Sequence, residues 1–253
     1  MNLRDVSVII TCFNEASNIR RCLDGVTGFG EVIVVDSFSS DATVGIAGEY
    51  PVMLFRRPYL SAAKQKNWAI ALANNDWVLV VDADEAVPRE LRAEIEALPE
   101  SGARDGYWIR RISEYLGKPI RRCGWQRDKV LRFFNKTRGR YNEREVHEEV
   151  VLQGGTGYFN SRLVHFPYSR IEQHFDKINE YSSRGARDYI DRGGKHPILN
   201  TLLHPPFRFI RMYLLQRGFM DGLHGFILCL LSSYSVFLKY AKAWEYRRRM
   251  ISR

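Results

Sequence analysis

The chain has 253 residues, of which 45% are hydrophobic and 13% aromatic, and these proportions exclude a largely disordered protein. A chain of this length can bury a complete core, in one large domain or in one domain with an appendage. The net charge of +9 is uneven, because the stretch from Asn200 onward holds nine Lys or Arg and only two acidic residues. The four cysteines lack the spacing of a metal site or a disulfide framework, so we expect reduced thiols in a cytosolic-facing protein.

Short apolar runs alternate with helical patterns in the first part of the chain. Continuous apolar strands that alternate with helices form parallel sheets with helices on both faces, so the sequence predicts an α/β protein. No GxGxxG or GxxxxGK[ST] motif is present to bind phosphates through a glycine-rich loop. We expect strands over residues 6–11, 31–35, 52–55, 77–81 and 130–134, and helices after Asn14, after Asp41 and over 61–73.

Polar residues stand where three of these strands end. Thr11 ends the first strand, Asp36 follows the second, and Asp82 and Asp84 follow the fourth. Because ligands of parallel sheets bind at the carboxyl ends of the strands, we expect these side chains to share one site. Clustered carboxylates there suit Mg²⁺ or Mn²⁺ carrying a nucleotide diphosphate. The alternative interpretation makes Asp84 a helix N-cap, and in either case Glu85 is expected to begin a helix.

The C-terminal region combines apolar and basic residues. The stretch 222–238 has no charged residue, and a helix of about 17 residues spans roughly 25 Å, which is short of a ~30 Å hydrocarbon core. Residues 207–217 interleave aromatic residues with arginines, as interfacial helices do, and 247–249 are three arginines that would meet anionic headgroups. We therefore expect a monotopic element on an anionic membrane surface. Helices packed on protein and a true membrane span remain alternatives, and nucleic acid is not an expected partner.

The order of four motifs gives a resemblance to a known family. The motifs are Val-Ser-Val-Ile-Ile-Thr-Cys-Phe-Asn-Glu at 6–15, Val-Val-Asp-Ser-Phe-Ser-Ser-Asp-Ala-Thr at 34–43, Lys-Gln-Lys-Asn-Trp at 64–68 and Val-Asp-Ala-Asp at 81–84. Together with Val-His-Glu at 146–148 and a tail with the pattern Tyr213 to Glu245, these motifs resemble the bacterial lipopolysaccharide core subgroup of family 2 glycosyltransferases, which adds a β-linked hexose, usually glucose.

This resemblance implies a fold and a division of the chain. It implies the GT-A fold, which is Rossmann-like, with a mostly parallel sheet and helices on both faces. The catalytic domain would span 1–165, with a donor half over about 1–100 and an acceptor half over about 101–165. Residues 166–253 would form a C-terminal helical region that associates with the membrane.

The resemblance also implies donor contacts. Thr11 and Glu15 would line the uridine pocket, and Asp36 and Lys66 would hold the nucleobase and ribose. The family commonly has a second Asp where this chain has Ser37, so Ser37 or a backbone group would replace that uracil contact. Two alternatives are structural: Lys66 as a solvated helix lysine, and Asp41, in the same motif as Asp36, as a helix cap.

The resemblance further implies the reacting groups. Asp84 would coordinate Mg²⁺ or Mn²⁺, and Asp82 would face the ribose or a metal-bound water. An inverting transfer is a single displacement at the anomeric carbon and needs a carboxylate to accept the proton of the acceptor hydroxyl. Glu148 is the expected base and Glu149 its alternative. His147 would orient the base or contact metal or phosphate, although this acidic run can also be a solvated loop.

The acceptor side is less defined by the sequence. Residues 106–122 mix basic and aromatic residues, as expected of an acceptor face, and His165 is expected in a structural or acceptor-side role. The arginines of this stretch would meet phosphates or acidic sugars, or form a solvated surface: Arg110, Arg111, Arg121 and Arg122.

These inferences predict an inverting, metal-dependent glycosyltransferase. It would transfer a hexose from a UDP-sugar, most simply glucose from UDP-glucose, to an inner-core sugar of lipopolysaccharide at the cytoplasmic face of the bacterial inner membrane. One alternative is a glycosyltransferase with a polyprenyl phosphate acceptor. The other is a non-catalytic nucleotide-sugar-binding membrane protein.

Overall fold

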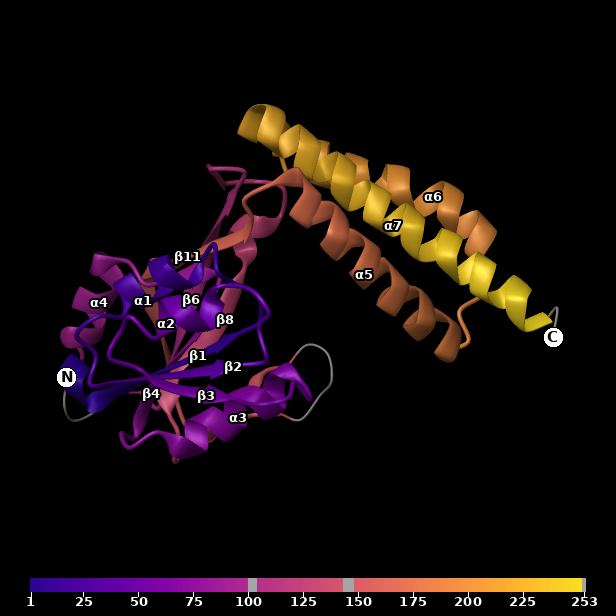
Figure 1. Ribbon diagram of the computed structural model, residues 1–253. Helices are drawn as coiled ribbons and strands as arrows, with labels where there is room; N and C mark the ends of the chain where they lie inside the picture. Colours follow the sequence, from indigo (N-terminus) through magenta and orange to yellow (C-terminus); the bar gives the residue numbers. More distant parts are fainter. Residues whose placement is uncertain (100–103, 143–147, 252–253) are drawn as a thin grey trace. The chain divides into compact units, whose positions relative to one another are not determined.

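A computed structural model describes residues 1–99, 104–142 and 148–251 of the chain (Figure 1). The chain forms two compact units. The first unit contains Met1–Ile112 and Arg127–Phe166, and the second contains Ser113–Gln126 and Pro167–Arg253. The main division therefore falls near residue 166, but the second unit also includes residues 113–126, which were expected in the acceptor half of the catalytic domain.

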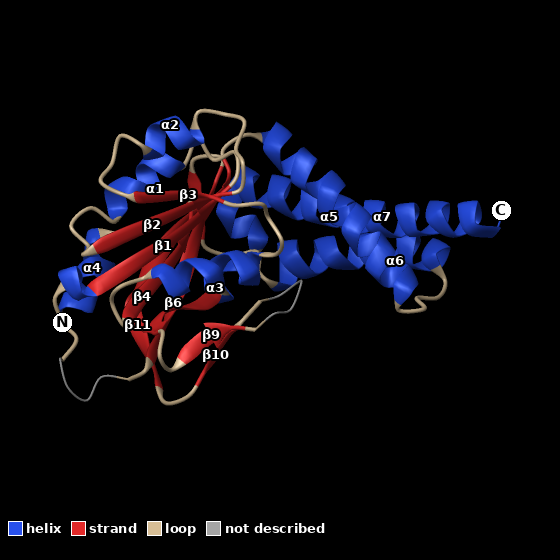
Figure 2. Cartoon of the chain, turned by 60° about the horizontal axis from the view of Figure 1, so that its bottom comes forward, coloured by secondary structure: helices blue, strands red, loops and turns tan. Residues whose placement is uncertain are grey.

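Four parallel strands form one half of the main sheet. Their order is β3-β2-β1-β4, and every pairing among them is parallel, as expected for apolar strands linked by helices. The strands agree with the predicted ones to within one residue at each end: β1 Val6–Cys12, β2 Glu31–Asp36, β3 Met53–Arg56 and β4 Trp77–Asp82 (Figure 2).

The other half of the sheet contains antiparallel pairs. β8 (Lys129–Asn135) pairs antiparallel with β4 and with β6 (Gly106–Tyr115), and β5 (Glu85–Ala86) pairs antiparallel with β11 (Thr156–Tyr168). The α/β class is thus confirmed, with parallel pairing among β1–β4 and antiparallel pairing of β8 with β4 and β6 and of β5 with β11. The remaining strands are β7 Lys118–Ile120, which pairs with β6, and the separate pair β9 Gly139–Tyr141 and β10 Val150–Leu152.

Alternate residues of the parallel strands point to opposite faces, and helices cover both faces. Ile9 and Ile33 pack with α3 (Ala62–Leu72) on one face. Val8 and Leu79 pack on the other face with three helices, which are α1 Ile19–Gly25, α2 Thr43–Ala47 and α4 Arg89–Glu96. This arrangement explains why the strands are apolar along their whole length.

The second unit is mainly helical. Helix α7 packs against α5 and α6, which Figure 1 shows running beside it. Lys242 of α7 donates to the backbone oxygen of Asn179 and to the hydroxyl of Ser182 on α5, both at 2.8 Å. Its helices are α5 Ile171–Asp191, α6 Pro197–Ile210 and α7 Gly222–Ile251, with a π-helical turn over Arg211–Leu215 and short 3₁₀ turns over Trp125–Arg127 and Gly218–Asp221; a further 3₁₀ turn, Leu3–Asp5, belongs to the first unit.

Helix α7 is longer than the sequence predicted. The expected helix of about 17 residues is part of a helix of 30 residues, because the charged C-terminal end continues the same helix. Within the described part of the chain, one helical stretch, Gly218–Met250, is long and apolar enough to cross a membrane by length and composition. All four cysteines are free and buried, as expected.

Candidate active site

The carboxyl ends of the parallel strands bring the predicted donor residues to one edge. In the β1–β4 register Thr11 stands opposite Asp82, and in the β1–β2 register Cys12 stands opposite Asp36. Thr11, Asp36 and Asp82 therefore lie at the same sheet edge, as the strand pattern predicted.

Asp36 is fully buried at this edge. Its Oδ2 accepts a hydrogen bond of 3.0 Å from the amide of Ser39 and lies 3.4 Å from Nε of Arg56. Burial and the neighbouring Asp36 carboxylate raise the pKa of the Cys12 thiol, so the thiol stays protonated. In this structure Asp36 stabilises its own loop, and its contact with a nucleobase stays a prediction.

The loops around Asp36 are held by side-chain hydrogen bonds. Asp41 accepts from the amides of Thr43 at 3.0 Å and Ala16 at 3.1 Å, so its role here is structural, although the N-cap residue of α2 is Ala42. Ser37 Oγ accepts from the buried Gln65 at 3.2 Å. Glu15, on the neighbouring loop, accepts from Asn18 at 2.8 Å. Hydrogen bonds within the protein therefore hold the loops on the predicted donor side in place.

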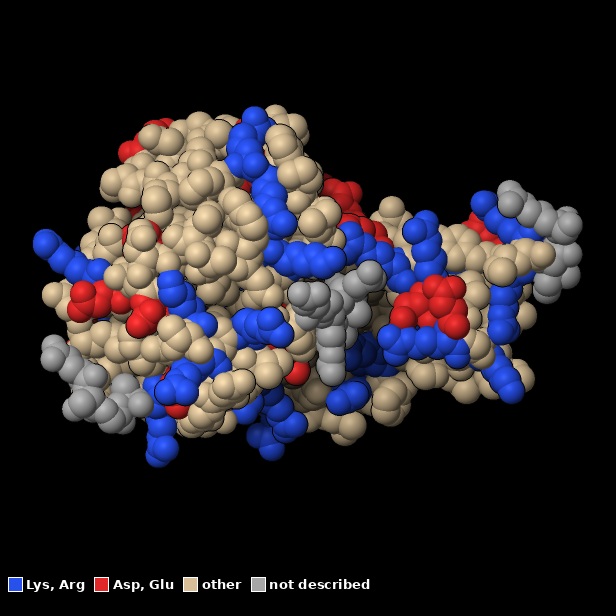
Figure 3. Space-filling model, turned by 90° about the horizontal axis from the view of Figure 1, so that it is seen from below, with Lys and Arg blue, Asp and Glu red and all other residues tan. Residues whose placement is uncertain are grey.

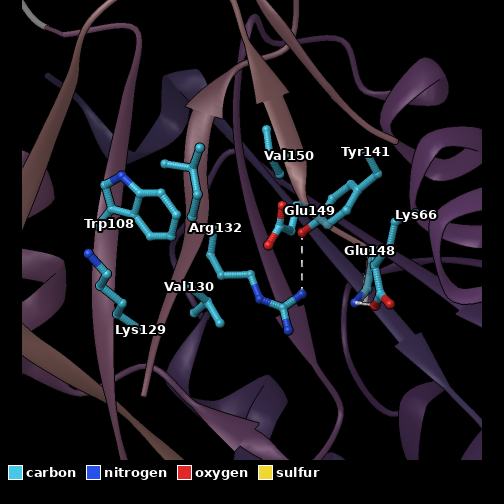
Figure 4. Close-up of a pocket in the computed structure, with 10 residues that line it drawn as sticks. Lys66, Trp108, Lys129, Val130, Arg132, Tyr141, Glu148, Glu149 and Val150 are labelled. Carbon is cyan, nitrogen blue, oxygen red and sulfur yellow. Dashed lines mark hydrogen bonds and ion pairs between the residues drawn. The ribbon is translucent and has the colours of Figure 1, made fainter. Parts of the chain in front are cut away.

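Lys66 connects the sheet edge to the predicted base. Its Nζ lies 3.1 Å from Oδ1 of Asp82. It also lies 3.1 Å from Oε1 of Glu148, as Figure 4 shows. The side chain is only 4% exposed, so the alternative of a solvated helix lysine is wrong. Burial and the nearby Arg132 lower the pKa of Lys66, but the charges of Asp82 and Glu148 outweigh them and raise it overall. Lys66 is therefore a buried, permanently charged bridge.

Arg132 is a site residue that the sequence analysis missed. Its guanidinium contacts Asp82 and donates to the hydroxyl of Tyr141 at 3.3 Å (Figure 4). Burial opposes ionisation of Asp82, but the charges of Arg132 and Lys66 prevail and hold the pKa of Asp82 well below its usual range. A lone arginine within the apolar run of β8 was the signal that could have revealed it, since buried charges need partners.

Glu85 does not begin a helix. It lies in strand β5, is almost fully buried, and accepts from the amide of Asp82 at 3.0 Å. Its other oxygen pairs with Arg111 at 2.9 Å, and Arg111 also pairs with Asp128 at 2.7 Å. The helix begins only at Arg89, after Pro88. Glu85 and Asp128 thus neutralise the charge of Arg111, so Arg111 is not available to bind the anionic groups of an acceptor as expected.

Asp84 lies beside His165. Strand β11 runs past β5 so that His165 stands opposite Glu85, and the amide of Phe166 donates to the Asp84 carbonyl at 2.8 Å. Nε2 of His165 is 3.4 Å from Oδ2 of Asp84. The interpretation of Asp84 as a helix N-cap is wrong, because α4 begins five residues later. In the described part of the chain no group of three or more His, Cys, Asp or Glu side chains converges as a metal site.

A cavity of about 160 Å³ adjoins Glu148. Glu148 and Glu149 both line it, so both candidates for the base remain, whereas His147 lies outside the described residues. The lining is completed by basic, aromatic and aliphatic side chains from α3, β6, β8, β9 and β10, which are Lys66, Trp108, Lys129, Val130, Leu131, Arg132, Tyr141 and Val150 (Figure 4).

Similar proteins include named glycosyltransferases. A glycosyltransferase of Rickettsia felis is 30% identical over 260 residues, covering 96% of this chain and 90% of that protein. The lipopolysaccharide core biosynthesis glycosyltransferase LpsC of Rhizobium meliloti is 28% identical over 253 residues, covering 95% and 92%. The solved structure of S. aureus TarS 1-349 in complex with UDP has a TM-score of 0.47 and 16% identity, covering 96% of this chain and 92% of that one.

The family comparison covers the unit that holds the sheet edge and the cavity. Residues 7–154 match the family described as glycosyl transferase family 2. This span contains the four motifs except for Val6, the first residue of the first motif, as well as Arg132 and Glu148. The chain therefore belongs to glycosyl transferase family 2 and is a glycosyltransferase.

Proposed function

We propose that this glycosyltransferase transfers a hexose with inversion from a UDP-sugar, expected to be UDP-glucose, to an inner-core sugar of lipopolysaccharide. The observation that carries the proposal is the Lys66 bridge, because it holds the Glu148 carboxylate close to the donor edge at Asp82. The similarity to LpsC, whose name refers to lipopolysaccharide core biosynthesis, supports the acceptor class. Thr11, Glu15, Asp36 and Ser37 are the proposed donor contacts.

The proposed reaction is a single displacement. The acceptor hydroxyl oxygen forms a bond to the anomeric carbon of the hexose while the bond from that carbon to the UDP oxygen breaks. Glu148 accepts the hydroxyl proton, and UDP leaves with the electron pair of the broken bond. Lys66, placed between Glu148 and Asp82, keeps the two carboxylates from repelling each other.

Asp84 and His165 fit a divalent cation as a pair. Adjacent ligands of an octahedral ion with bonds of ~2.1 Å lie about 3.0 Å apart, close to the 3.4 Å between the two side-chain atoms. Two protein ligands leave positions for diphosphate oxygens and water, and a carboxylate with an imidazole suits Mn²⁺ at least as well as Mg²⁺. When bound, the cation would neutralise the charge of the departing diphosphate.

A UDP-release screen tests this function. The purified chain is incubated with UDP-glucose, UDP-galactose or UDP-N-acetylglucosamine, with truncated lipopolysaccharide cores, and with Mn²⁺, Mg²⁺ or a chelator. We expect acceptor-dependent UDP release with UDP-glucose that is lost with the chelator. Sugar recovered on a polyprenyl phosphate would favour the alternative acceptor, and absence of UDP release from every donor would contradict the proposal.

We also propose that the second unit binds the cytoplasmic face of the inner membrane through the surface of α6 and the turns that follow it. Large exposed apolar patches on a protein surface mark sites of interaction with a partner or a membrane. Ten large apolar side chains there are between 47% and 72% exposed: Ile198, Leu199, Leu202, Leu203, Phe207, Ile210, Leu214, Leu215, Phe219 and Met220.

The charge of this segment supports an anionic lipid surface as the partner. No acidic residue occurs between Asp191 and Asp221, and Arg208, Arg211 and Arg217 are exposed and form no ion pair with any described residue. Each basic side chain near an anionic surface contributes about 1 kcal/mol. On the face shown in Figure 3, Lys and Arg spread over both units whereas Asp and Glu gather in small patches.

The C-terminal arginines are a weaker candidate for headgroup contact than the sequence suggested. Arg247 donates to the carbonyl of Gly194 at 2.5 Å, and Arg249 pairs with Glu245 one helical turn earlier at 2.6 Å. Part of their hydrogen-bonding capacity is thus used within the unit. We therefore assign the headgroup contacts to the arginines that follow α6.

A further inference from the structure

The cavity beside Glu148 is lined by one cation that no described carboxylate neutralises. Lys66 and Arg132 are both committed to Asp82, and Lys66 also pairs with Glu148. Lys129, the third cation of the lining, forms no ion pair with any carboxylate that the structure describes. The positive charge of Lys129 is therefore available to a ligand.

Neutral groups hold the Lys129 ammonium in place. Its Nζ lies 5.0 Å from the ring centroid of Trp108 and 5.2 Å from that of Tyr158, and it donates to the Tyr158 hydroxyl at 3.2 Å (Figure 4 shows Trp108 and Lys129). Cation–π contacts of this kind position an ammonium without cancelling its charge. An ammonium has three donors, so two remain for an anion.

The rest of the lining suits a sugar ring. Trp108, Val130 and Val150 provide apolar surface, and the carboxylates of Glu148 and Glu149 provide acceptors for hydroxyl groups (Figure 4). Sites of this composition, with apolar walls and a few placed polar groups, bind and orient small molecules. A pyranose has the same two kinds of surface, since its ring carries C–H faces and a hydroxyl edge.

We propose that this cavity is the acceptor subsite and that Lys129 recognises an anionic substituent, a phosphate or a carboxylate, on the acceptor sugar. The inference rests on the proposed function, because it takes Glu148 as the group that receives the acceptor proton. A substituent held at Lys129 fixes the sugar in the cavity and presents one hydroxyl to Glu148. Lys129 is thus a specificity-determining residue and takes no part in proton transfer.

The test compares Lys129→Gln and Lys129→Arg with Arg138→Gln, which removes the same charge from an exposed position outside the cavity. Acceptors are a truncated core that carries its phosphates and carboxylates, the same core after dephosphorylation, and the same core after carboxyl reduction. Transfer kinetics are measured with each, and acceptor binding is measured separately by calorimetry.

We expect Lys129→Gln to raise KM and Kd for the untreated core at least tenfold with little change in kcat, as for loss of a charge-assisted hydrogen bond. Lys129→Arg and Arg138→Gln retain wild-type values. We expect wild type and Lys129→Gln to have the same KM and Kd for one of the two treated cores. The group removed from that core, phosphate or carboxylate, is the anion that Lys129 binds.

The inference is overturned if Lys129→Gln weakens binding of all three acceptors equally, or if it weakens binding of none of them. If the proposed function is wrong, the wild type releases no UDP with any donor. The acceptor Kd values of wild type and Lys129→Gln still test the role of Lys129 in that case.

Discussion

At the scale of single residues, the buried charges around Asp82 act as one network. Lys66 and Arg132 both contact Asp82, Lys66 reaches Glu148, and Glu85 accepts from the Asp82 amide. Charges buried in this way are tolerated because each has an oppositely charged or hydrogen-bonding partner. The network therefore places the base candidate and also stabilises the sheet edge.

Removing Arg132 from this network should destabilise the first unit. In Arg132→Leu the Asp82 carboxylate loses its closest cation, and breaking a buried pair on one side costs about 3–5 kcal/mol. Chemical denaturation followed by tryptophan fluorescence measures the change. The matched control Arg138→Leu, at an exposed position, should change stability by less than about 0.5 kcal/mol. Equal denaturation midpoints for the two variants would show that Arg132 is not needed to balance the network.

His174 gives the second unit a pH-dependent stability. Burial, assisted by the charge of Lys177, lowers the pKa of His174 to about 4; its Nδ1 lies 2.9 Å from the Tyr115 hydroxyl, and its ring stacks on Tyr168. The unfolded histidine, with a pKa near 6.5, binds its proton first as pH falls, so stability is complete above about pH 6.5 and decreases toward pH 4.

The loss at pH 5 relative to pH 7.5 should be on the order of 2 kcal/mol, and it should disappear in His174→Asn. Thermal unfolding of both proteins at the two pH values measures it. A variant with the same pH dependence as the wild type would assign the effect to other groups.

The position of a site residue could be predicted where it depends on the neighbouring sequence, and could not where it depends on contacts between distant parts of the chain. Thr11, Asp36 and Asp82 could be placed because each stands at the end of an apolar strand. Arg132 and His165 could not, because they reach the edge through antiparallel strands that pair far along the chain. Glu85 was misinterpreted for the same reason, since its partner strand β11 lies about 80 residues later.

At the scale of elements, the parallel strands and their helices were predictable, whereas the extent of α7 was not. Apolar runs bounded by polar residues define β1–β4 locally. Helix α7 continues through its charged end because that end packs within the helical unit, where Lys242 is bound by α5. Packing of this kind overrides the composition change at Lys239 that suggested a boundary.

The α6 surface should control membrane binding. Leu202 and Phe207 are 67% and 61% exposed, so Leu202→Gln with Phe207→Gln should leave the fold intact while removing apolar contact with lipid. We expect the double variant to bind vesicles containing anionic phospholipid at least tenfold more weakly than wild type in a flotation assay. Leu60→Gln, which is 61% exposed in the first unit, is the matched control.

Binding to neutral vesicles should be weaker than to anionic ones and should depend less on salt. Equal binding to both kinds of vesicle, or wild-type binding by the double variant, would contradict the assignment. Retention of the double variant on membranes after alkaline carbonate extraction would instead favour a membrane-spanning α7.

At the scale of the whole molecule, one chain combines a family 2 glycosyltransferase unit with a helical unit that exposes a large apolar and basic surface. The first unit holds the donor edge, the paired Asp84 and His165, and the cavity beside Glu148. The proposed lipid-linked acceptor would account for the presence of both units in one protein. In the proposed hexose transfer from a UDP-sugar, Glu148 receives the acceptor proton.

The most direct test measures glucose transfer from UDP-glucose to truncated lipopolysaccharide core by the full chain, its Glu148→Gln variant and its Glu149→Gln variant, together with UDP binding by each. We predict that Glu148→Gln lowers kcat by ~10²–10⁴-fold and retains UDP binding, while Glu149→Gln stays near wild type. Transfer by Glu148→Gln at the wild-type rate, or loss of transfer in Glu149→Gln alone, would contradict the account.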